Sequence, residues 1–442
     1  MRQSLNSYIS LCKWISIPFF SLCVIFNSVA RFDFTAPSPW PEIRKERLKT
    51  ILPTAMKVAN VDAWLVICRE NNNDPLAKHV GCENAGKTAV FMFYFDIDDK
   101  SNKQFVSVAF SPDGEATALK DISLLDEVYA VPRNEEAITI ASERVKQLKF
   151  SSIAINMSDK DPQADGISFT QYLALTTALG QEYSQRLVSA DTLIQEYLSI
   201  KLPAEVDIMR EAAKLTAKWQ IEAYQQIEVG KTKDSDVAKY LKQKMREYGV
   251  SDAWAPTQNP NVVSGTDRGH SHATDRVIQH GDVIQTDFGI RVFDTWVTDI
   301  QRFAYVLQPN ETQVPKDIAH YWESAKQGRQ AAFNAMKPGA TGKDVDAAQR
   351  AVMVATNSKH VMWSTGHPVG YVAHDSGPSL SSTHENGAKR LKAGMTFAFD
   401  GFHSWIMDNG QPKTISVEEM VVITDKGAQY LIPPQQDLIL IK

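Results

Sequence analysis

Residues 283–302 read VIQTDFGIRVFDTWVTDIQR, two apolar, strand-like runs that each lead to an aspartate. Asp287 follows the first run and Asp299 the second, and residues 292–295 (VFDT) between them are the expected turn of a hairpin. The two aspartates are twelve positions apart (299 − 287), and this even separation puts both on one face of the hairpin. Buried carboxylates at such spacing repel each other unless a cation lies between them. Two isolated aspartates on a hairpin are usually solvated turn residues. Whether this pair binds a metal therefore depends on further ligand-type residues elsewhere in the chain.

Three further residues with ligand-type side chains lie in strand-like surroundings downstream. His367 is the second residue of the segment GHPVGYVAHD (366–375), Asp400 follows the apolar run 395–399, and Glu418 precedes the apolar run 420–423. A lone histidine on an apolar strand is usually a satisfied core group, but carboxylates facing a core are costly unless a metal or a partner neutralises them. Four carboxylates and one imidazole can hold two divalent ions about 3.5–4 Å apart, which is typical of hydrolases. The predicted ligands are Asp287, Asp299, His367, Asp400 and Glu418.

At these positions the chain resembles metallopeptidase family M24, which contains methionine aminopeptidase, aminopeptidase P and prolidase. The resemblance spans residues 200–442 and rests on segments in the family's order: DFG (287–289), TDIQR (298–302), GH (366–367), GMTFAFD (394–400) and EEMVVIT (418–424). It implies an α/β (α+β) fold class, a pita-bread catalytic domain with a pseudo-two-fold duplication. A smaller α/β domain resembling that of creatinase is expected to precede it.

The resemblance also implies a role for each ligand residue. Asp287 and Glu418 would bridge two ions, Asp299 would chelate one of them, and His367 with Asp400 would bind the other. Oxygen-rich ligation with one imidazole favours Mn²⁺, with Zn²⁺, Co²⁺ or Fe²⁺ as alternatives.

Histidines outside the ligand set have implied roles as well. His374 matches the family's second histidine and would donate to the oxygen of the tetrahedral intermediate, while Asp400 or Glu418 would transfer the proton. His270 matches the histidine that lies over the substrate amide, although His272 is close enough to compete for that assignment.

The sequence departs from the family pattern at several positions. The two aspartates are usually eleven apart, and a bulge can absorb the extra residue. Asp400 replaces a glutamate, which shortens the reach of that ligand, and Pro368 replaces a glycine. Ser416 stands where the proline-specific enzymes usually have an arginine, which weakens the argument for Xaa-Pro specificity.

The remaining chain divides into segments of different character. Residues 1–30 are predicted to be a signal peptide, 31–199 the creatinase-like α/β domain and 200–442 the catalytic domain. In the last segment the order helix, Gly-x-Thr turn, helix, strands occurs twice, about a hundred residues apart. A duplicated unit explains this repetition, but the turn sequences are common enough to arise without one.

The first thirty residues resemble a secretory signal. A basic start is followed by the apolar run 14–26 and the small-residue site Ser28-Val29-Ala30. The run is short for a membrane span, which needs roughly 20 residues. The sequence therefore predicts a periplasmic or secreted protein, anchored to a membrane if the signal is uncleaved, with no stable insertion after cleavage.

Two of the four cysteines, Cys12 and Cys23, belong to that leader. Cys68 and Cys82 remain, and an oxidising compartment would permit them to pair. Cys68 ends an apolar run, however, so a buried free thiol is the favoured interpretation.

The charge composition excludes one class of binding partner. The 442 residues carry 47 Lys+Arg against 52 Asp+Glu, for a formal charge of −5 without a basic run, so nucleic acid is not an expected partner. We expect a metal-dependent exopeptidase that acts on short peptides, an Xaa-Pro aminopeptidase or dipeptidase, and a homodimer by resemblance. The alternatives are a creatinase-like hydrolase or lyase of the same fold, and a non-catalytic peptide-binding relative.

Overall fold

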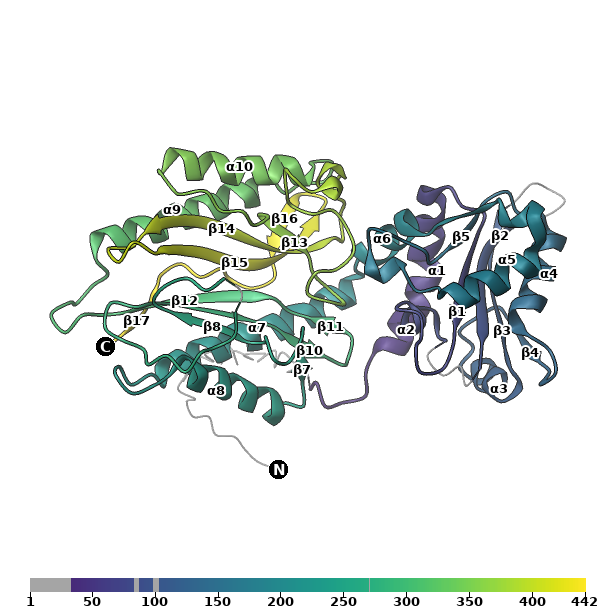
Figure 1. The fold of residues 1–442 in the computed structure, drawn as a ribbon, viewed down its shortest axis with the longest axis horizontal. Helices are drawn as coiled ribbons and strands as arrows, with labels where there is room; N and C mark the ends of the chain where they lie inside the picture. Colours follow the sequence, from purple (N-terminus) through teal and green to yellow (C-terminus); the bar gives the residue numbers. More distant parts are fainter. Residues whose placement is uncertain (1–32, 83–86, 98–102, 270) are drawn as a thin grey trace, which may run out of the picture. The chain divides into compact units, whose positions relative to one another are not determined.

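The computed structural model describes residues 33–82, 87–97, 103–269 and 271–442. Its first part contains a six-stranded sheet in the order β4-β3-β2-β1-β5-β6 (Figure 1). The sheet is mixed, because β2 runs antiparallel to β1 and β3 whereas β5 runs parallel to β1. Its strands are β1 (Ala63–Cys68), β2 (Ala89–Ile97), β3 (Lys103–Pro112), β4 (Glu127–Val131), β5 (Ile153–Ile155) and β6 (Leu187–Ser189).

Helices cover both faces of this sheet, which explains why β1 is apolar at every position. Trp64 and Val66 pack into one cluster with residues of α1 and α6, and Leu65 and Ile67 pack into another with residues of α4 and α5. The helices are α1 (Trp40–Ala59), α2 (Ala77–Val80), α3 (Asp113–Ile122), α4 (Ala137–Leu148), α5 (Phe169–Ser184) and α6 (Asp191–Ser199), with a 3₁₀ turn η1 (Pro162–Ala164).

The second part repeats one arrangement, two helices followed by a four-stranded sheet. The first copy consists of α7 (Pro203–Gln225), α8 (Asp234–Glu247) and the sheet β17-β12-β9-β8. Its strands are β8 (Asn261–Ser264), β9 (Val283–Phe288), β12 (Ile300–Val306) and β17 (Ile439–Ile441). A short sheet β11-β10-β7 adjoins it, with β7 (Ser251–Asp252), β10 (Ile290–Val292) and β11 (Trp296–Val297).

The second copy consists of α9 (Lys316–Ala335), α10 (Gly342–Ala355) and the sheet β13-β14-β15-β16. Its strands are β13 (Gly366–Pro368), β14 (Thr396–Ile406), β15 (Pro412–Thr424) and β16 (Gly427–Tyr430), and a 3₁₀ turn η2 (Glu385–Ala388) precedes β14. Helix α9 packs on β14 and β15, α7 packs on β12, and the two sheets meet where β12 contacts β15 (Figure 1). All five predicted ligand residues lie on or beside these strands.

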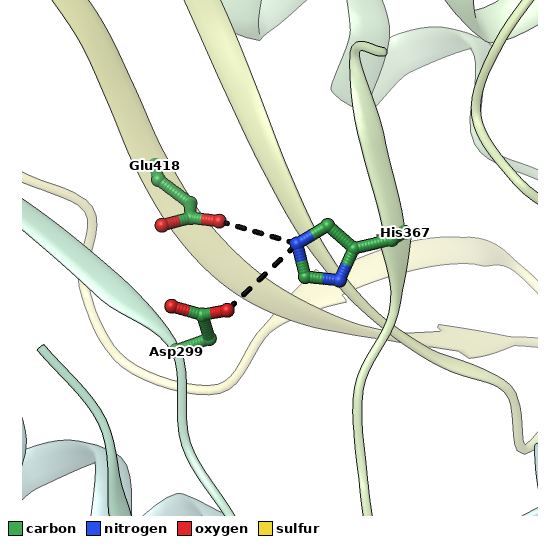
Figure 2. A group of neighbouring side chains, drawn as sticks. All are labelled: Asp299, His367 and Glu418. Carbon is green, nitrogen blue, oxygen red and sulfur yellow. Dashed lines mark ion pairs between the residues drawn. The ribbon is translucent and has the colours of Figure 1, made fainter. Parts of the chain in front are cut away.

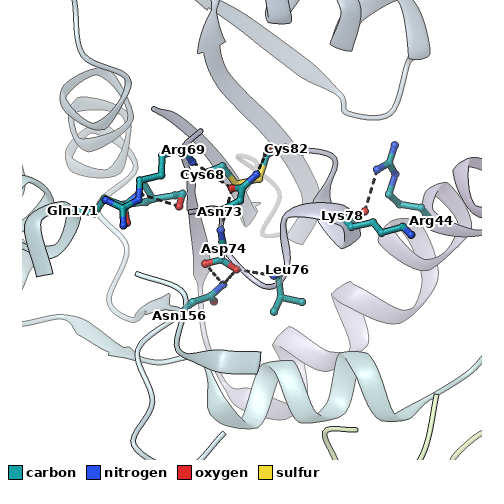
Figure 3. Close-up of a disulfide and its surroundings, with 11 residues drawn as sticks. Arg44, Cys68, Arg69, Asn73, Asp74, Leu76, Lys78, Cys82, Asn156 and Gln171 are labelled. Carbon is teal, nitrogen blue, oxygen red and sulfur yellow. Dashed lines mark hydrogen bonds between the residues drawn. A yellow bond between two sulfur atoms is a disulfide. The ribbon is translucent and has the colours of Figure 1, made fainter. Parts of the chain in front are cut away.

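Cys68 and Cys82 form a disulfide, so the expectation of a free buried thiol is wrong (Figure 3). The Asn73 side chain links the two ends of the loop that the disulfide closes. Its oxygen accepts a hydrogen bond from the Arg69 N–H (3.3 Å), and its nitrogen donates one to the Cys82 carbonyl (3.3 Å). Apolar surroundings suit either form of cysteine, and for this reason the β1 pattern could not distinguish them.

Candidate metal centre

Asp287 and Asp299 lie on the two arms of one hairpin, as predicted. Strand β9 pairs with β12 so that Asp287 is opposite Gln301, and Asp299 lies just before β12. Positions 299 and 301 face the same side of the ladder, which places both aspartates on one face.

The turn of this hairpin also falls where the sequence indicated. The Thr295 N–H donates to the Val292 carbonyl (3.0 Å), and Phe293 and Asp294 both have positive φ, 51° and 52°. The ladder is centred on residue 294 because Val292 pairs with Trp296. The hairpin therefore turns through the three-residue loop 293–295.

The other predicted ligands come from the second sheet. His367 lies in β13, and Asp400 and Glu418 are directly opposed on β14 and β15. Asp400 was expected to end its strand and Glu418 to begin the next, but β14 continues to Ile406 and β15 starts at Pro412. Both carboxylates thus lie inside one long hairpin, where neighbouring strands fix their positions.

Three of the five predicted ligands have donor atoms in immediate proximity. One donor atom each from Asp299, His367 and Glu418 lies within 4.8 Å of the others. The His367 Nε2 atom is 3.7 Å from Asp299 Oδ2 and 3.7 Å from Glu418 Oε1 (Figure 2). The resemblance assigned Asp299 and His367 to different ions, whereas here one imidazole nitrogen faces both carboxylates.

Asp287 and Asp400 belong to the same charged group. Burial raises the pKa of Asp299 well above its ordinary value, and Asp287 adds to this shift through its charge and a hydrogen bond. Burial likewise raises the pKa of Glu418, to which the charges of Asp299 and Asp400 contribute. Four carboxyl groups this close cannot all be ionised unless cations offset their charge.

The donor set fits divalent metal ions. The Glu418 Oε2 atom is buried and has no hydrogen-bond partner among residues 33–442 that the structure describes. A buried carboxylate oxygen without a donor is costly, and a cation is the partner that removes this cost. Oxygen ligands with one imidazole suit the harder divalent metals, as the sequence indicated.

A cavity of about 530 Å³ opens onto this group and is lined by His367, His374, Asp400, Glu418 and Gln301. The rings of His367 and His374 are 4.2 Å apart between centroids and nearly perpendicular (79°), so His374 borders the predicted ligands. His270 lies outside the described residues, and His272 is exposed. Cavities of this size are typical of sites for small ligands.

A group of neutral polar residues, which the sequence did not indicate, lies beside the carboxylates. The Gln301 side-chain oxygen accepts from the Gln285 amide (2.7 Å) and from the Ser416 hydroxyl (2.7 Å), all three buried. Ser416 thus forms part of a compact hydrogen-bonded set at the position where an arginine was expected. Period-two alternation could have found Gln301, because it follows Asp299 by two positions on the same face.

An ion pair on the opposite face of these strands was missed as well. Both terminal nitrogens of Arg302 donate to the Glu419 carboxylate (3.1 Å each), and both side chains are buried. The pair joins β12 to β15 directly behind Gln301 and Glu418, and it secures the two sheets at the site.

Comparison with known proteins identifies the family. The sequence profile of Metallopeptidase family M24 matches residues 207–425. An Xaa-Pro dipeptidase of Pyrococcus furiosus is 28% identical over 255 residues, 56% of this chain and 67% of that protein. A putative dipeptidase of Bacillus subtilis is 27% identical over 300 residues, 67% of this chain and 76% of that protein. The chain belongs to metallopeptidase family M24 and is a hydrolase.

Solved structures confirm the predicted fold class. An X-Pro aminopeptidase of Thermotoga maritima superposes with a TM-score of 0.65 at 20% identity, covering 88% of this chain and 100% of that one. The dipeptidase PepE of Mycobacterium ulcerans gives a TM-score of 0.68 at 18% identity, covering 92% and 100%. At these identities the likeness concerns the fold, which is the pita-bread fold preceded by a smaller α/β part.

The predicted periplasmic or secreted location requires correction. The Xaa-Pro dipeptidases of Pyrococcus furiosus and Pyrococcus horikoshii that match the chain are cytoplasmic enzymes, which contradicts the inference from the leader. The predicted signal peptide, residues 1–30, lies outside the described residues. None of the helices in the described part of the chain combines the length and the apolar composition that a membrane span requires. The leader pattern misled because it uses only a short apolar run and small residues, which other N-terminal segments share.

Proposed function

We propose that the protein is a dinuclear metal-dependent exopeptidase that removes the N-terminal residue from short peptides whose second residue is proline, as an Xaa-Pro aminopeptidase or dipeptidase. The observation that carries the proposal is the convergence of Asp299, His367 and Glu418 within 4.8 Å, with His367 and Glu418 also lining a cavity of about 530 Å³. The preference for proline is supported by the relatives, which include an Xaa-Pro dipeptidase and an X-Pro aminopeptidase. Because Ser416 stands where an arginine is expected in proline-specific enzymes, paired Xaa-Pro and Xaa-Ala peptides test this preference directly.

The proposed ligands follow from position and chemistry. Asp287 and Glu418 would bridge two ions, Asp299 would chelate one, and His367 with Asp400 would hold the other. When bound, divalent ions lower the pKa of water to near neutrality and polarise a carbonyl, and Mn²⁺ suits this oxygen-rich set best.

The chain's own residues would move the proton and stabilise charge. Asp400 or Glu418 takes the proton from the attacking water and returns it to the leaving nitrogen, since both are buried carboxyls at the cavity wall. His374, beside His367, donates a hydrogen bond to the oxyanion that develops on the scissile carbonyl. His270 would lie over the substrate amide.

Two further points extend the proposal beyond the site. We retain residues 31–199 as a creatinase-like domain and 200–442 as the catalytic domain. We also expect a homodimer by resemblance to the family. Light scattering of the purified protein during gel filtration tests the second point, and a monomeric mass would contradict it.

The experiment is a rate comparison across Xaa-Pro and Xaa-Ala dipeptides and tripeptides with added Mn²⁺. We expect Xaa-Pro substrates to be cleaved fastest. Loss of a residue that only supports a metal ligand typically lowers activity by about 10–100-fold. Asp299→Ala removes a proposed ligand itself, so it should lower kcat/KM by more than that. Asp294→Asn is the matched control, because Asp294 is exposed at the tip of the same hairpin and asparagine tolerates its positive φ. Equal rates for Asp299→Ala and the native protein would contradict the proposal.

A further inference from the structure

The segment between His367 and His374 is folded back on itself by the residue that follows it. The Asp375 N–H donates to the Pro368 carbonyl (3.0 Å), and Asp375 Oδ2 accepts from the Tyr371 N–H (3.0 Å). Both ends of the segment are thereby fixed relative to each other, and with them the backbone positions that carry the two imidazoles. The Asp375 side chain itself is fully buried, with 0% exposure.

Lys201 supplies the counter-charge for this buried carboxylate. Its Nζ atom lies 3.0 Å from Asp375 Oδ2, donates to the Leu198 carbonyl (2.6 Å) and is also fully buried. Burial lowers the pKa of Lys201, and the charge of Asp375 opposes that shift. A Cβ at Gly370 would lie 2.2 Å from Lys201 Cε, so only glycine lets the lysine reach the segment.

The other carboxylate oxygen is held from the first part of the chain. Gln163, in η1, donates through Nε2 to Asp375 Oδ1 (2.9 Å) and to Ser376 Oγ (2.8 Å). The Ser376 hydroxyl in turn donates to Asp161 Oδ2 (2.7 Å). With the Ser376 N–H also donating to Oδ1 (2.9 Å), each oxygen of Asp375 has two donors. The orientation of this carboxylate is therefore fixed on all sides.

We infer that Asp375 is a positioning residue for His374, held in place by Lys201 and by Gln163 from the creatinase-like part of the chain. The covalent neighbour of Asp375 is the proposed oxyanion donor, so a shift of the backbone that Asp375 anchors would displace that imidazole. The inference rests on the proposed function, because it concerns the geometry of a catalytic group. It gives residues 161–163 a role in turnover, although they contribute none of the predicted metal ligands.

The test uses the full-length, Mn²⁺-loaded protein and the dipeptide Ala-Pro. Asp375→Asn should lower kcat by about 10–100-fold, the cost of a small misplacement of a catalytic group. Because Asp375→Asn leaves Lys201 buried without its counter-charge and can impair folding, Gln163→Met serves as a second variant. It removes only the hydrogen bonds from η1, and we expect a kcat loss of about 3–10-fold with KM changed by less than about twofold.

The decisive readout is a double-mutant cycle with His374→Ala. If Gln163 acts through His374, adding Gln163→Met to His374→Ala should change kcat by less than about twofold. The metal content and the thermal midpoint of unfolding of the Gln163→Met variant should match those of the native protein. Glu385→Gln is the matched control, since Glu385 makes an exposed contact with Lys160 beside the same η1 segment and should leave kcat unchanged.

The outcomes distinguish a failure of the positioning role from a failure of the proposed function. Hydrolysis by the native protein with equal, multiplicative losses in both backgrounds would overturn the positioning role and leave the proposed function intact. Absence of hydrolysis by the native protein would overturn the proposed function and the inference together.

Discussion

Asp400 and Glu418 occupy directly opposed positions on β14 and β15, and both are almost fully buried. Like charges opposite each other destabilise an antiparallel pair by about 0.2–1 kcal/mol, and burial adds to that cost. The hairpin therefore places two groups together that are stable side by side only when protonated or bound to a cation. This is the physical reason to regard the pair as part of a metal centre.

Neutralising one member of this pair should affect the metal-free and metal-loaded protein in opposite ways. In excess chelator above neutral pH, Asp400→Asn should raise the free energy of unfolding by up to about 1 kcal/mol, because a repulsion is lost. With Mn²⁺ present the same variant should bind metal more weakly. Urea unfolding with and without metal measures both effects, with the exposed Asp408→Asn in the turn of the same hairpin as control. Destabilisation in chelator with unchanged metal affinity would count against the account.

The raised pKa values give the stability of the metal-free protein a defined pH dependence. Asp299 and Glu418 have folded-state pKa values well above their ordinary values of 3.8 and 4.5. The folded state therefore binds more protons than the unfolded state, and the stability that this gives is complete below those ordinary values. It is lost as the pH rises through the raised pKa values.

Bound metal should reverse this trend, because the ions displace the protons and their affinity rises with pH. Unfolding curves across a pH series, with chelator and with Mn²⁺, provide the measurement. A metal-free protein that gains stability steadily from acid to alkaline pH would be inconsistent with protonated carboxyls at the site.

Removing the imidazole of His374 should impair turnover without emptying the metal centre. His374→Ala should lower kcat by about 10²–10³, the size of losing one oxyanion donor. Metal content should stay that of the native protein, since His374 is not among the proposed ligands. His360→Ala, which removes an exposed imidazole after α10, is the control. An unchanged kcat would show that His374 has no such role.

The disulfide should contribute measurably to stability. Cys68 and Cys82 are 14 positions apart, and closing a loop of that length stabilises a protein by about 3 kcal/mol in the chain-entropy account. The double variant Cys68→Ala, Cys82→Ala should unfold at correspondingly lower urea concentration. Dithiothreitol should lower the stability of the native protein and leave the double variant unaffected. Equal stability of the two proteins without reductant would exclude this contribution.

Much of the site was predictable because its parts are local. Period-two alternation placed Asp287 and Asp299 on one hairpin face, and their turn falls where the residues 292–295 indicated. His367, Asp400 and Glu418 were recognised by unusual residue types on apolar strands. Short-range patterns report which face of a strand a residue occupies, and at this site that was most of the information needed.

The parts that escaped prediction depend on contacts between distant segments. Lys201 and Asp375 are 174 positions apart, and nothing in either local sequence indicates the other. The pairing of Cys68 with Cys82 required the course of the chain between them. The full lengths of β14 and β15 were missed because charged residues usually end strands, whereas here they line a site.

Metal titration of the purified, chelator-treated protein tests the central claim most directly. Isothermal calorimetry with Mn²⁺, checked by elemental analysis, should give two ions per chain, with protons released on binding. Asp299→Ala should lose at least one of them while Asp294→Asn keeps both. No uptake by the native protein, or identical uptake by Asp299→Ala, would contradict the claim that these carboxylates form a metal centre.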